Sequence, residues 1–414
     1  MHHRPIVKKL LVGLVLSATA LMAGPITTVP WNGYTGAASI TYDDGRPSQL
    51  SDLMPQVDKL GIKVTFFLAN NMYSFPGKQS DWIKAAKNGH ELANHSGNHN
   101  SPTAANIADM AKVLRGLDPT VDAVTYAYPN CTVNANDASG ENFMARGCAS
   151  AQYGWNGSEP NWMNIQALIV ETKSNGSNLK AATDNINAAK SGNSWTVILM
   201  HDVTSSSSDI YYLTPTENLA MLNAAVNAKV WVAPFGTVGA YYRAHFTMDK
   251  VTASGAGPWN LTWTSPHAKM PKSVKLKVKL DAATFGSSFT VSQDNVTIPA
   301  NTDGSYTIDF MKLKLAVTKG SSGVSRASGL ALGGVSLRRT ASEIVMTGIG
   351  STGFDMTVRN LNGRILASKH VEARSDAGTE KLALDPTLAG SPVLAVISAT
   401  DGSALRSIPL APVR

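Results

Sequence analysis

The sequence has few cysteines, little charge and no long apolar run after its first residues. Cysteine occurs twice, at Cys131 and Cys148, and only 16% of the 414 residues are charged, against 43% hydrophobic. This balance is typical of a folded chain and excludes a disordered one. The formal net charge is +7, yet no basic run is interleaved with aromatic residues, so we expect no nucleic-acid partner. No G-x-S-x-G motif occurs either, which disfavours a serine hydrolase.

The N-terminal residues are typical of an export signal. Arg4, Lys8 and Lys9 precede the apolar stretch 10–16, and small residues follow, with cleavage expected near Ala20 or after Ala23. The apolar stretch is short for a membrane anchor, and no later segment is long enough to span a bilayer. We therefore expect a signal peptide over 1–23 and a secreted, periplasmic or cell-surface protein. In such a compartment an even pair of cysteines predicts a disulfide between Cys131 and Cys148.

Between residues 30 and 246, short apolar runs alternate with amphipathic stretches. The apolar runs predict buried strands at 37–42, 63–68, 91–94, 124–128, 168–172, 196–200 and 230–235. The amphipathic stretches predict helices at 49–60, 104–117, 179–190 and 216–225. Repeated strand–helix units predict an α/β domain with a parallel sheet, and their number favours a closed or nearly closed barrel over an open doubly wound sheet.

The pattern changes after residue 246. Residues 274–280 alternate strictly between apolar residues and lysines, which indicates a half-buried strand of an antiparallel sheet. Further short strand patterns follow, interrupted by a segment rich in Gly and Ser. We expect a β-rich module at 247–320, a linker at 321–341 and a C-terminal β-sandwich at 342–414. That last module would attach or sort the protein, or would merely stabilise or space the enzyme.

Two adjacent carboxylates, Asp43 and Asp44, directly follow the first predicted strand, in the run T-Y-D-D-G. In a barrel, residues at the carboxyl end of a strand face the active-site mouth. One carboxylate could bind a metal while the other acts as a base toward water. The plainer alternative is a turn, because Asp-Asp-Gly is also common turn chemistry.

Two histidines, His95 and His99, follow the strand predicted at 91–94. Their spacing lets both meet one ion, although a polar loop with incidental histidines is the alternative. One carboxylate and two histidines would leave open positions, as at a catalytic Zn²⁺ site. A third histidine, His201, ends the strand predicted at 196–200, where it could protonate a leaving group or simply be a loop residue.

These motifs together resemble the polysaccharide deacetylase (NodB-homology) family, which carries T-F-D-D-G, H-S/T-x-x-H and L-x-H in this order. The match covers about Thr41 to Arg243. The resemblance implies a distorted (β/α) barrel that uses a divalent metal, most often Zn²⁺, to remove acetyl groups from a polysaccharide. It implies that Asp44, His95 and His99 bind the metal, that Asp43 is the general base and that His201 is the general acid.

The same resemblance places substrate-contacting residues at Tyr128, Pro129, Asn130, Trp162 and Leu199. Two features of the family pattern are missing. The arginine of the third motif, which orients the base, is replaced in the run Ala127-Tyr128-Pro129-Asn130, and the fourth motif lacks the carboxylate that would tune the acid histidine. Because of these two gaps, a non-catalytic glycan-binding homologue remains the alternative to an enzyme. Within the enzyme class, O-deacetylation of acetylxylan and N-deacetylation of chitin or peptidoglycan remain equally open, as does the oligomeric state.

Overall fold

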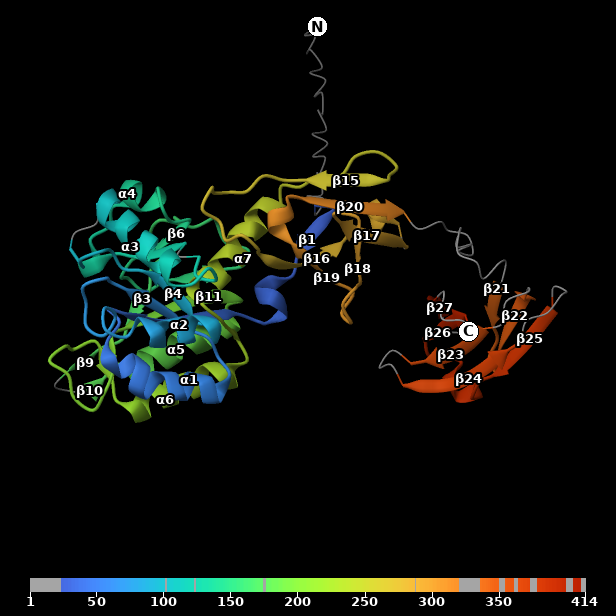
Figure 1. Ribbon diagram of the computed structural model, residues 1–414, viewed down its shortest axis with the longest axis horizontal. Helices are drawn as coiled ribbons and strands as arrows, with labels where there is room; N and C mark the ends of the chain where they lie inside the picture. The colour runs from blue at the N-terminus through green and yellow to red at the C-terminus, as the bar shows by residue number, and fades with distance from the viewer. Residues whose placement is uncertain are drawn as a thin grey trace, which may run out of the picture. The chain divides into compact units, whose positions relative to one another are not determined.

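The computed structural model describes residues 24–410 except 101–102, 123, 174–175, 287, 320–335, 350–353, 361–363, 373–377 and 400–404. It forms two compact units that divide between Gly320 and Ser321 (Figure 1). The expected signal peptide and most of the expected linker lie outside the described residues. Within the described part of the chain, no helix has the length and apolar character needed to cross a bilayer.

A nine-stranded, mostly parallel sheet forms the centre of the first unit. Its main strand order is β6-β5-β4-β3-β2-β11-β7, in which all pairings but that of β7 are parallel. Two short strands, β8 and β14, pair with β11 and β2. The strands are β2 (Ala37–Asp43), β3 (Thr65–Leu68), β4 (Glu91–Asn94), β5 (Thr125–Ala127), β6 (Met144–Arg146), β7 (Gln152–Gly154), β8 (Leu168–Ile169), β11 (Ser194–Met200) and β14 (Trp231–Val232).

The segment between β7 and β11 closes this sheet into a barrel. Ile165 forms a parallel bridge with Arg146 at the β6 edge, supported by a 2.7 Å hydrogen bond from the Gly147 amide to the Ile165 carbonyl. A few residues later, β8 pairs in parallel with β11 at the other edge. One short stretch therefore contacts both edges, and the expected α/β barrel is confirmed.

Helices cover the outside of the barrel (Figure 1). They are the π-helix η2 (Gln49–Leu53), α1 (Met54–Leu60), α2 (Gln79–Lys87), α3 (Ala104–Leu117), α4 (Ala135–Ser139), α5 (Leu179–Ser191), α6 (Pro215–Ala228) and α7 (Phe235–Met248). The sequence patterns did not predict α2 or α7. The strand expected at 230–235 was too long, because only Trp231–Val232 pairs and α7 begins at Phe235.

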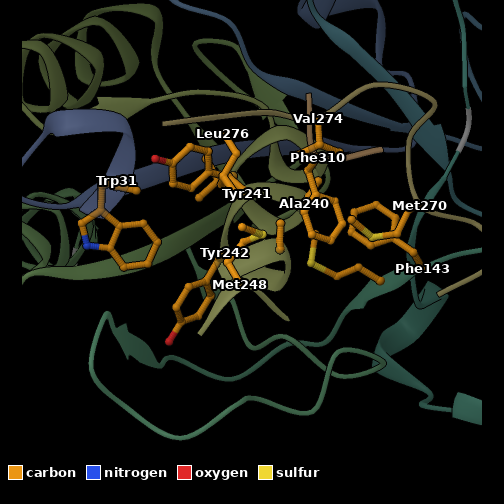
Figure 2. Close-up of a cluster of buried hydrophobic side chains, with 14 of the residues drawn as sticks. Trp31, Phe143, Ala240, Tyr241, Tyr242, Met248, Met270, Val274, Leu276 and Phe310 are labelled. Carbon is orange, nitrogen blue, oxygen red and sulfur yellow. The ribbon is translucent and has the colours of Figure 1, made fainter. Parts of the chain in front are cut away.

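The β-rich segment after α7 shares its hydrophobic core with the barrel. It forms two small sheets, β1-β16-β19 and β15-β20-β17-β18. Side chains of α7, among them Tyr241 and Tyr242, belong to the same buried cluster as Leu276 and Phe310 of this segment (Figure 2). Its strands are β15 (Trp259–Thr262), β16 (Lys275–Leu280), β17 (Phe289–Gln293), β18 (Val296–Ile298), β19 (Tyr306–Asp309) and β20 (Lys314–Lys319). The strand β1 (Ile26–Thr28) precedes the barrel in the chain and pairs with β16. The barrel and this segment therefore form one compact unit.

The second unit consists of two antiparallel sheets, β21-β22-β25 and β24-β23-β26-β27. Apolar side chains of both sheets, including Met346, Phe354 and Ile397, form one buried cluster. The strands are β21 (Ser336–Arg339), β22 (Glu343–Ile349), β23 (Phe354–Arg359), β24 (Ile365–Val371), β25 (Gly378–Ala383), β26 (Val393–Ala399) and β27 (Leu405–Leu410).

A part-buried carboxylate, Glu91, lies where β4 begins, opposite the first turn of α7. Its Oε2 accepts hydrogen bonds from the Gly236 amide and the Thr65 hydroxyl, each at 2.8 Å, and its Oε1 accepts one from the Thr125 hydroxyl at 2.6 Å. Burial raises the pKa of Glu91, although these hydrogen bonds act in the opposite direction. The folded state therefore holds this proton more tightly than the unfolded chain, and stability falls as the pH rises from the ordinary Glu value through the raised one.

We expect Glu91→Gln to gain stability over the native protein as the pH rises above 4.5. Glutamine fits the site, because its carbonyl oxygen can accept from Gly236 and Thr65 while its amide donates to the Thr125 hydroxyl. Urea unfolding between about pH 4 and about pH 8 measures the difference. All eight tryptophans lie in the first unit, so their fluorescence reports on it alone.

The matched control for this measurement is Glu141→Gln. The pKa of Glu141 is lowered because the hydrogen bond and charge of Arg115 outweigh its burial, so this variant should lose stability relative to the native protein as the pH rises. A free-energy difference for Glu91→Gln that stays constant with pH would contradict the assignment.

Candidate active site

The three sequence motifs meet at the carboxyl ends of the barrel strands. Asp43 ends β2, His95 directly follows β4, and His201 directly follows β11. The β3 strand between the first two motifs holds them together, because its Phe67 carbonyl accepts from the Asp44 amide and its Leu68 carbonyl accepts from the His95 amide, both at 2.9 Å. Since β2 pairs with both β3 and β11, all three motifs lie at one end of the sheet.

Asp44, His95 and His99 present three ligand atoms to one point. The Oδ1 of Asp44 lies 3.5 Å from His95 Nε2 and 3.1 Å from His99 Nε2, and it is buried without a hydrogen-bond partner. His95 Nδ1 is 2.8 Å from the Ala127 carbonyl, so Nδ1 carries the proton and Nε2 keeps its lone pair for the site. An orphaned carboxylate oxygen beside such a histidine fits a divalent metal.

The backbone at these ligands is held in an unusual conformation. Asp44, Ser96 and His99 have φ angles of 75°, 71° and 56°, in the left-handed region that non-glycine residues rarely adopt. The loop is held by its own polar groups, since the Ser96 amide donates to Asn94 Oδ1 at 2.8 Å and the His99 amide donates to Ser96 Oγ at 3.0 Å. Such strain is common where side chains must meet at a functional site.

A second group of ligand-type atoms, formed by Asp44, His201 and Asp209, is occupied by an arginine. The Nη2 of Arg46 lies 3.1 Å from Asp44 Oδ2 and 2.6 Å from Asp209 Oδ2, and its Nη1 lies 3.2 Å from Asp202 Oδ2. A guanidinium on these oxygens leaves no place for a second cation. The group of Asp44, His95 and His99 is therefore the better metal site.

An arginine that the motif comparison missed contacts the candidate base. Arg146, at the end of β6, is fully buried, and its Nη2 donates to Asp43 Oδ2. The same carboxylate oxygen lies 3.9 Å from His95 Nε2. The arginine absent from the third motif is thus supplied by the next strand. The available signal was a charged residue that ends an otherwise apolar strand, as Asp43 does.

A carboxylate that the sequence analysis also missed contacts His201. Asp209 Oδ2 lies 2.6 Å from His201 Nδ1, and its Oδ1 accepts from the Tyr211 amide at 3.0 Å. Burial alone would lower the pKa of His201, but the hydrogen bond with Asp209 and the nearby charges of Asp43 and Asp44 raise it. No local pattern marks Asp209, which follows a run of serines in the loop after β11.

Comparison with known proteins gives this site a family. Residues 34–136, which include both aspartates and both metal-site histidines, match the model described as polysaccharide deacetylase. Residues 34–136 thus resemble a polysaccharide deacetylase domain. The match ends before Arg146, His201 and Asp209; His201 was predicted from its own sequence motif, whereas Arg146 and Asp209 are placed at the site only by the structure.

Two curated proteins are similar to the chain over part of its length. One is named a probable peptidoglycan-N-acetylglucosamine deacetylase of Arthroderma benhamiae, 29% identical over 111 residues, which are 25% of this chain and 25% of that protein. The other is a gellan lyase of a Bacillus species, 23% identical over 287 residues, which are 60% of this chain and 11% of that protein. The chain thus spans a quarter or less of these relatives.

Solved structures are similar over about half of the chain. The Xyl-CE4 domain of a xylanase from the hindgut metagenome of Trinervitermes trinervoides is 19% identical, with 49% of this chain and 89% of that one covered and a TM-score of 0.33. A family 4 acetyl xylan esterase from Clostridium thermocellum is 18% identical, with the same coverage and TM-score. A peptidoglycan deacetylase from Bacillus subtilis is 14% identical, again with this coverage and TM-score.

A pocket of about 290 Å³ opens beside the candidate metal ligands. Its lining includes Asp43, His95, His99, Tyr128, Asn130, Ile169, Leu199, His201, Tyr211 and both cysteines. Cys131 and Cys148 form a disulfide, the pairing expected from the sequence. The bond ties the loop after β5, where Asn130 and Cys131 have positive φ angles of 51° and 57°, to the end of β6. The disulfide is therefore part of the pocket wall.

The remaining expected contact residues are distributed differently. Tyr128 and Leu199 line the pocket with Asn130, whereas Pro129 is buried beneath it. Trp162 lies outside the pocket lining and packs against Tyr242 and Phe246 of α7. Its indole N–H donates to Glu159 at 2.8 Å. The fourth-motif tryptophan thus belongs to the hydrophobic core, because the segment that carries it closes the barrel.

Proposed function

We propose that the chain is a secreted, metal-dependent hydrolase that removes acetyl groups from a polysaccharide. The observation that carries this proposal is the group of Asp44, His95 and His99 beside a pocket that Asp43 and His201 also line. These three ligands would hold a divalent ion, and Zn²⁺ suits a site of two imidazoles and one carboxylate. When bound, such an ion makes water more acidic and polarises a carbonyl group.

Asp43 is placed to act as the base. Its Oδ1 is buried without a hydrogen-bond partner, while Arg146 holds its Oδ2. The free oxygen can accept a proton from water as the water oxygen attacks the acetyl carbon. The Asn130 residue on the pocket wall offers a backbone N–H for the oxygen that becomes negative in this step.

His201 is placed to act as the acid. Asp209 fixes its Nδ1, which leaves Nε2 for the pocket. The hydrogen bond to Asp209 raises the pKa of His201, which favours the protonated imidazole that donates to the sugar oxygen or nitrogen as the bond to the acetyl carbon breaks. The products are acetate and a free hydroxyl or amine. The acid thus has both the proton and the orientation that the reaction needs.

A non-catalytic glycan-binding protein is the second candidate, since two family features were missing from the sequence motifs. Arg146 contacts Asp43 and Asp209 contacts His201, so the candidate base and acid each have the kind of partner that the sequence motifs lacked, which counts against that alternative. The choice between an ester and an amide substrate is left to the acetate-release test.

Acetate release tests the proposal directly. We expect the purified protein to release acetate from one of acetylxylan, chitin oligomers or peptidoglycan, to lose this activity after chelation, and to regain it with Zn²⁺. Removing the ion should lower turnover by at least about a hundredfold, because both water activation and carbonyl polarisation are lost. Unchanged release in the stripped protein would contradict the metal-dependent mechanism. No release from any substrate, with glycan binding retained, would favour the second candidate.

A further inference from the structure

Exposed apolar side chains gather around the mouth of the candidate active site. Among the described residues, three of the exposed large hydrophobic side chains lie on loops that follow barrel strands: Tyr73 after β3, Val133 after β5 and Ile210 after β11. Their exposed fractions are 51%, 44% and 46%. All three loops leave the carboxyl ends of the strands, where the pocket opens. Tyr73 alone of the three has a flat ring.

The ring of Tyr73 is supported from one side by a fixed cation. The guanidinium carbon of Arg46 lies 4.0 Å from the centre of the ring. Arg46 cannot move freely, because Asp44, Asp202 and Asp209 hold it by ion pairs of 3.1, 3.2 and 2.6 Å. With about half of its surface exposed, the tyrosine keeps its other face open to solvent. The ring is thus held close to the metal ligand Asp44 without being buried.

The backbone of Tyr73 adopts an unfavourable conformation in this exposed position. Its φ angle is 42°, in the left-handed region that a bulky residue rarely adopts. The next two residues anchor the loop: the Ser74 amide donates to the Gly45 carbonyl at 3.1 Å, and Phe75 is fully buried. A strained backbone that keeps an aromatic ring in solvent contributes nothing to the core, which points to a ligand.

We propose that Tyr73 is a stacking platform for a pyranose ring of the polysaccharide, next to the sugar unit whose acetyl group is removed. This inference rests on the proposed function. The pocket of about 290 Å³ lies at the lower end of the ~300–1,000 Å³ range of small-molecule sites, so the neighbouring units of a polymer lie on the rim. The C–H face of a pyranose is apolar and packs against an aromatic ring, while the tyrosine hydroxyl can bond to sugar hydroxyls.

The test compares short and long substrates. The probes are the acetylated monosaccharide and the corresponding tetrasaccharide of whichever glycan the acetate assay identifies. For Tyr73→Ala, we expect KM to rise roughly tenfold more on the tetrasaccharide than on the monosaccharide, because only the longer chain reaches the platform. Tyr73→Phe keeps the flat ring and should retain most of the native KM. Titration of the tetrasaccharide in a calorimeter gives the same comparison without turnover.

Tyr34→Ala is the matched control. Tyr34 is 46% exposed, but it precedes β2 and so lies at the opposite end of the barrel strands, where substitution should leave both substrates unaffected. An equal loss on both substrates with Tyr73→Ala would assign Tyr73 to the support of Arg46 and overturn the platform. Unchanged tetrasaccharide binding and turnover would overturn it too. These outcomes differ from failure of the proposed function, in which the native protein releases no acetate.

Discussion

Replacing Asp43 with asparagine is expected to lower kcat by about 10²–10⁴-fold while the protein still binds its divalent ion. The amide keeps the size of the side chain but cannot accept the proton from water. The ligand atoms of Asp44, His95 and His99 are untouched, because Asp43 Oδ2 faces Arg146 and stands 3.9 Å from His95 Nε2. Acetate release and metal content, measured on the same preparation, check both parts of this expectation.

Asp44→Ala is the informative partner of this variant. It removes the carboxylate whose free Oδ1 lies between the two histidines, so metal content itself should fall with activity. The two substitutions would then have different effects: Asp43→Asn would lose turnover but keep the metal, and Asp44→Ala would lose both. Full turnover by Asp43→Asn would exclude Asp43 as the base, and loss of metal in both variants would show that the two carboxylates bind the ion together.

Replacing Arg146 with methionine is expected to destabilise the metal-free first unit by about 3–5 kcal/mol and to lower kcat. Arg146 is fully buried, and without it the nearly buried carboxylate of Asp43 loses its cation. Methionine has a similar length and fills the space against Phe67, over whose ring the guanidinium lies at 5.2 Å. The loss in the free energy of unfolding then reports the unpaired charge of Asp43 and not a cavity left by the arginine side chain.

Urea unfolding followed by tryptophan fluorescence measures the change in stability, and acetate release measures the change in kcat. Arg146→Lys serves as the control, because it restores a positive charge but not the two-pronged guanidinium, and should fall between the native protein and the methionine variant. The buried Nε of Arg146 has no hydrogen-bond partner, so its removal offsets part of the loss. A methionine variant as stable and active as the native protein would show that Arg146 does not support the base.

The sequence predicted those parts of the site that local patterns determine. An apolar strand followed at once by polar residues places Asp43, Asp44, His95 and His201 at strand ends, and parallel strands bring such ends together. The same logic located most strands to within a few residues. Local spacing was therefore sufficient to bring these side chains to one site, while their roles as metal ligand, base and acid stay predictions.

Residues that depend on distant contacts could not be predicted in this way. Arg146 reaches Asp43 across 103 positions of sequence, so its role depends on the pairing of strands and not on any motif. Asp209 is placed by an irregular loop, which has no periodicity to detect. Helix α7 was missed because it is buried on nearly all sides, from Phe235 to Met248, and so lacks the polar face that marks an amphipathic helix.

The position of β11 has a consequence for the order in which the site is built during synthesis. β2 pairs with β11, and the Thr41 hydroxyl reaches the Ile198 carbonyl across 157 positions of sequence. Until about half of the chain has been made, β2 exposes an unpaired edge, which invites association with other chains. Asp44, His95 and His99 all precede β11, whereas His201 directly follows it. A growing chain thus acquires its three candidate metal ligands first, and the candidate acid is added only with the strand that covers the exposed edge.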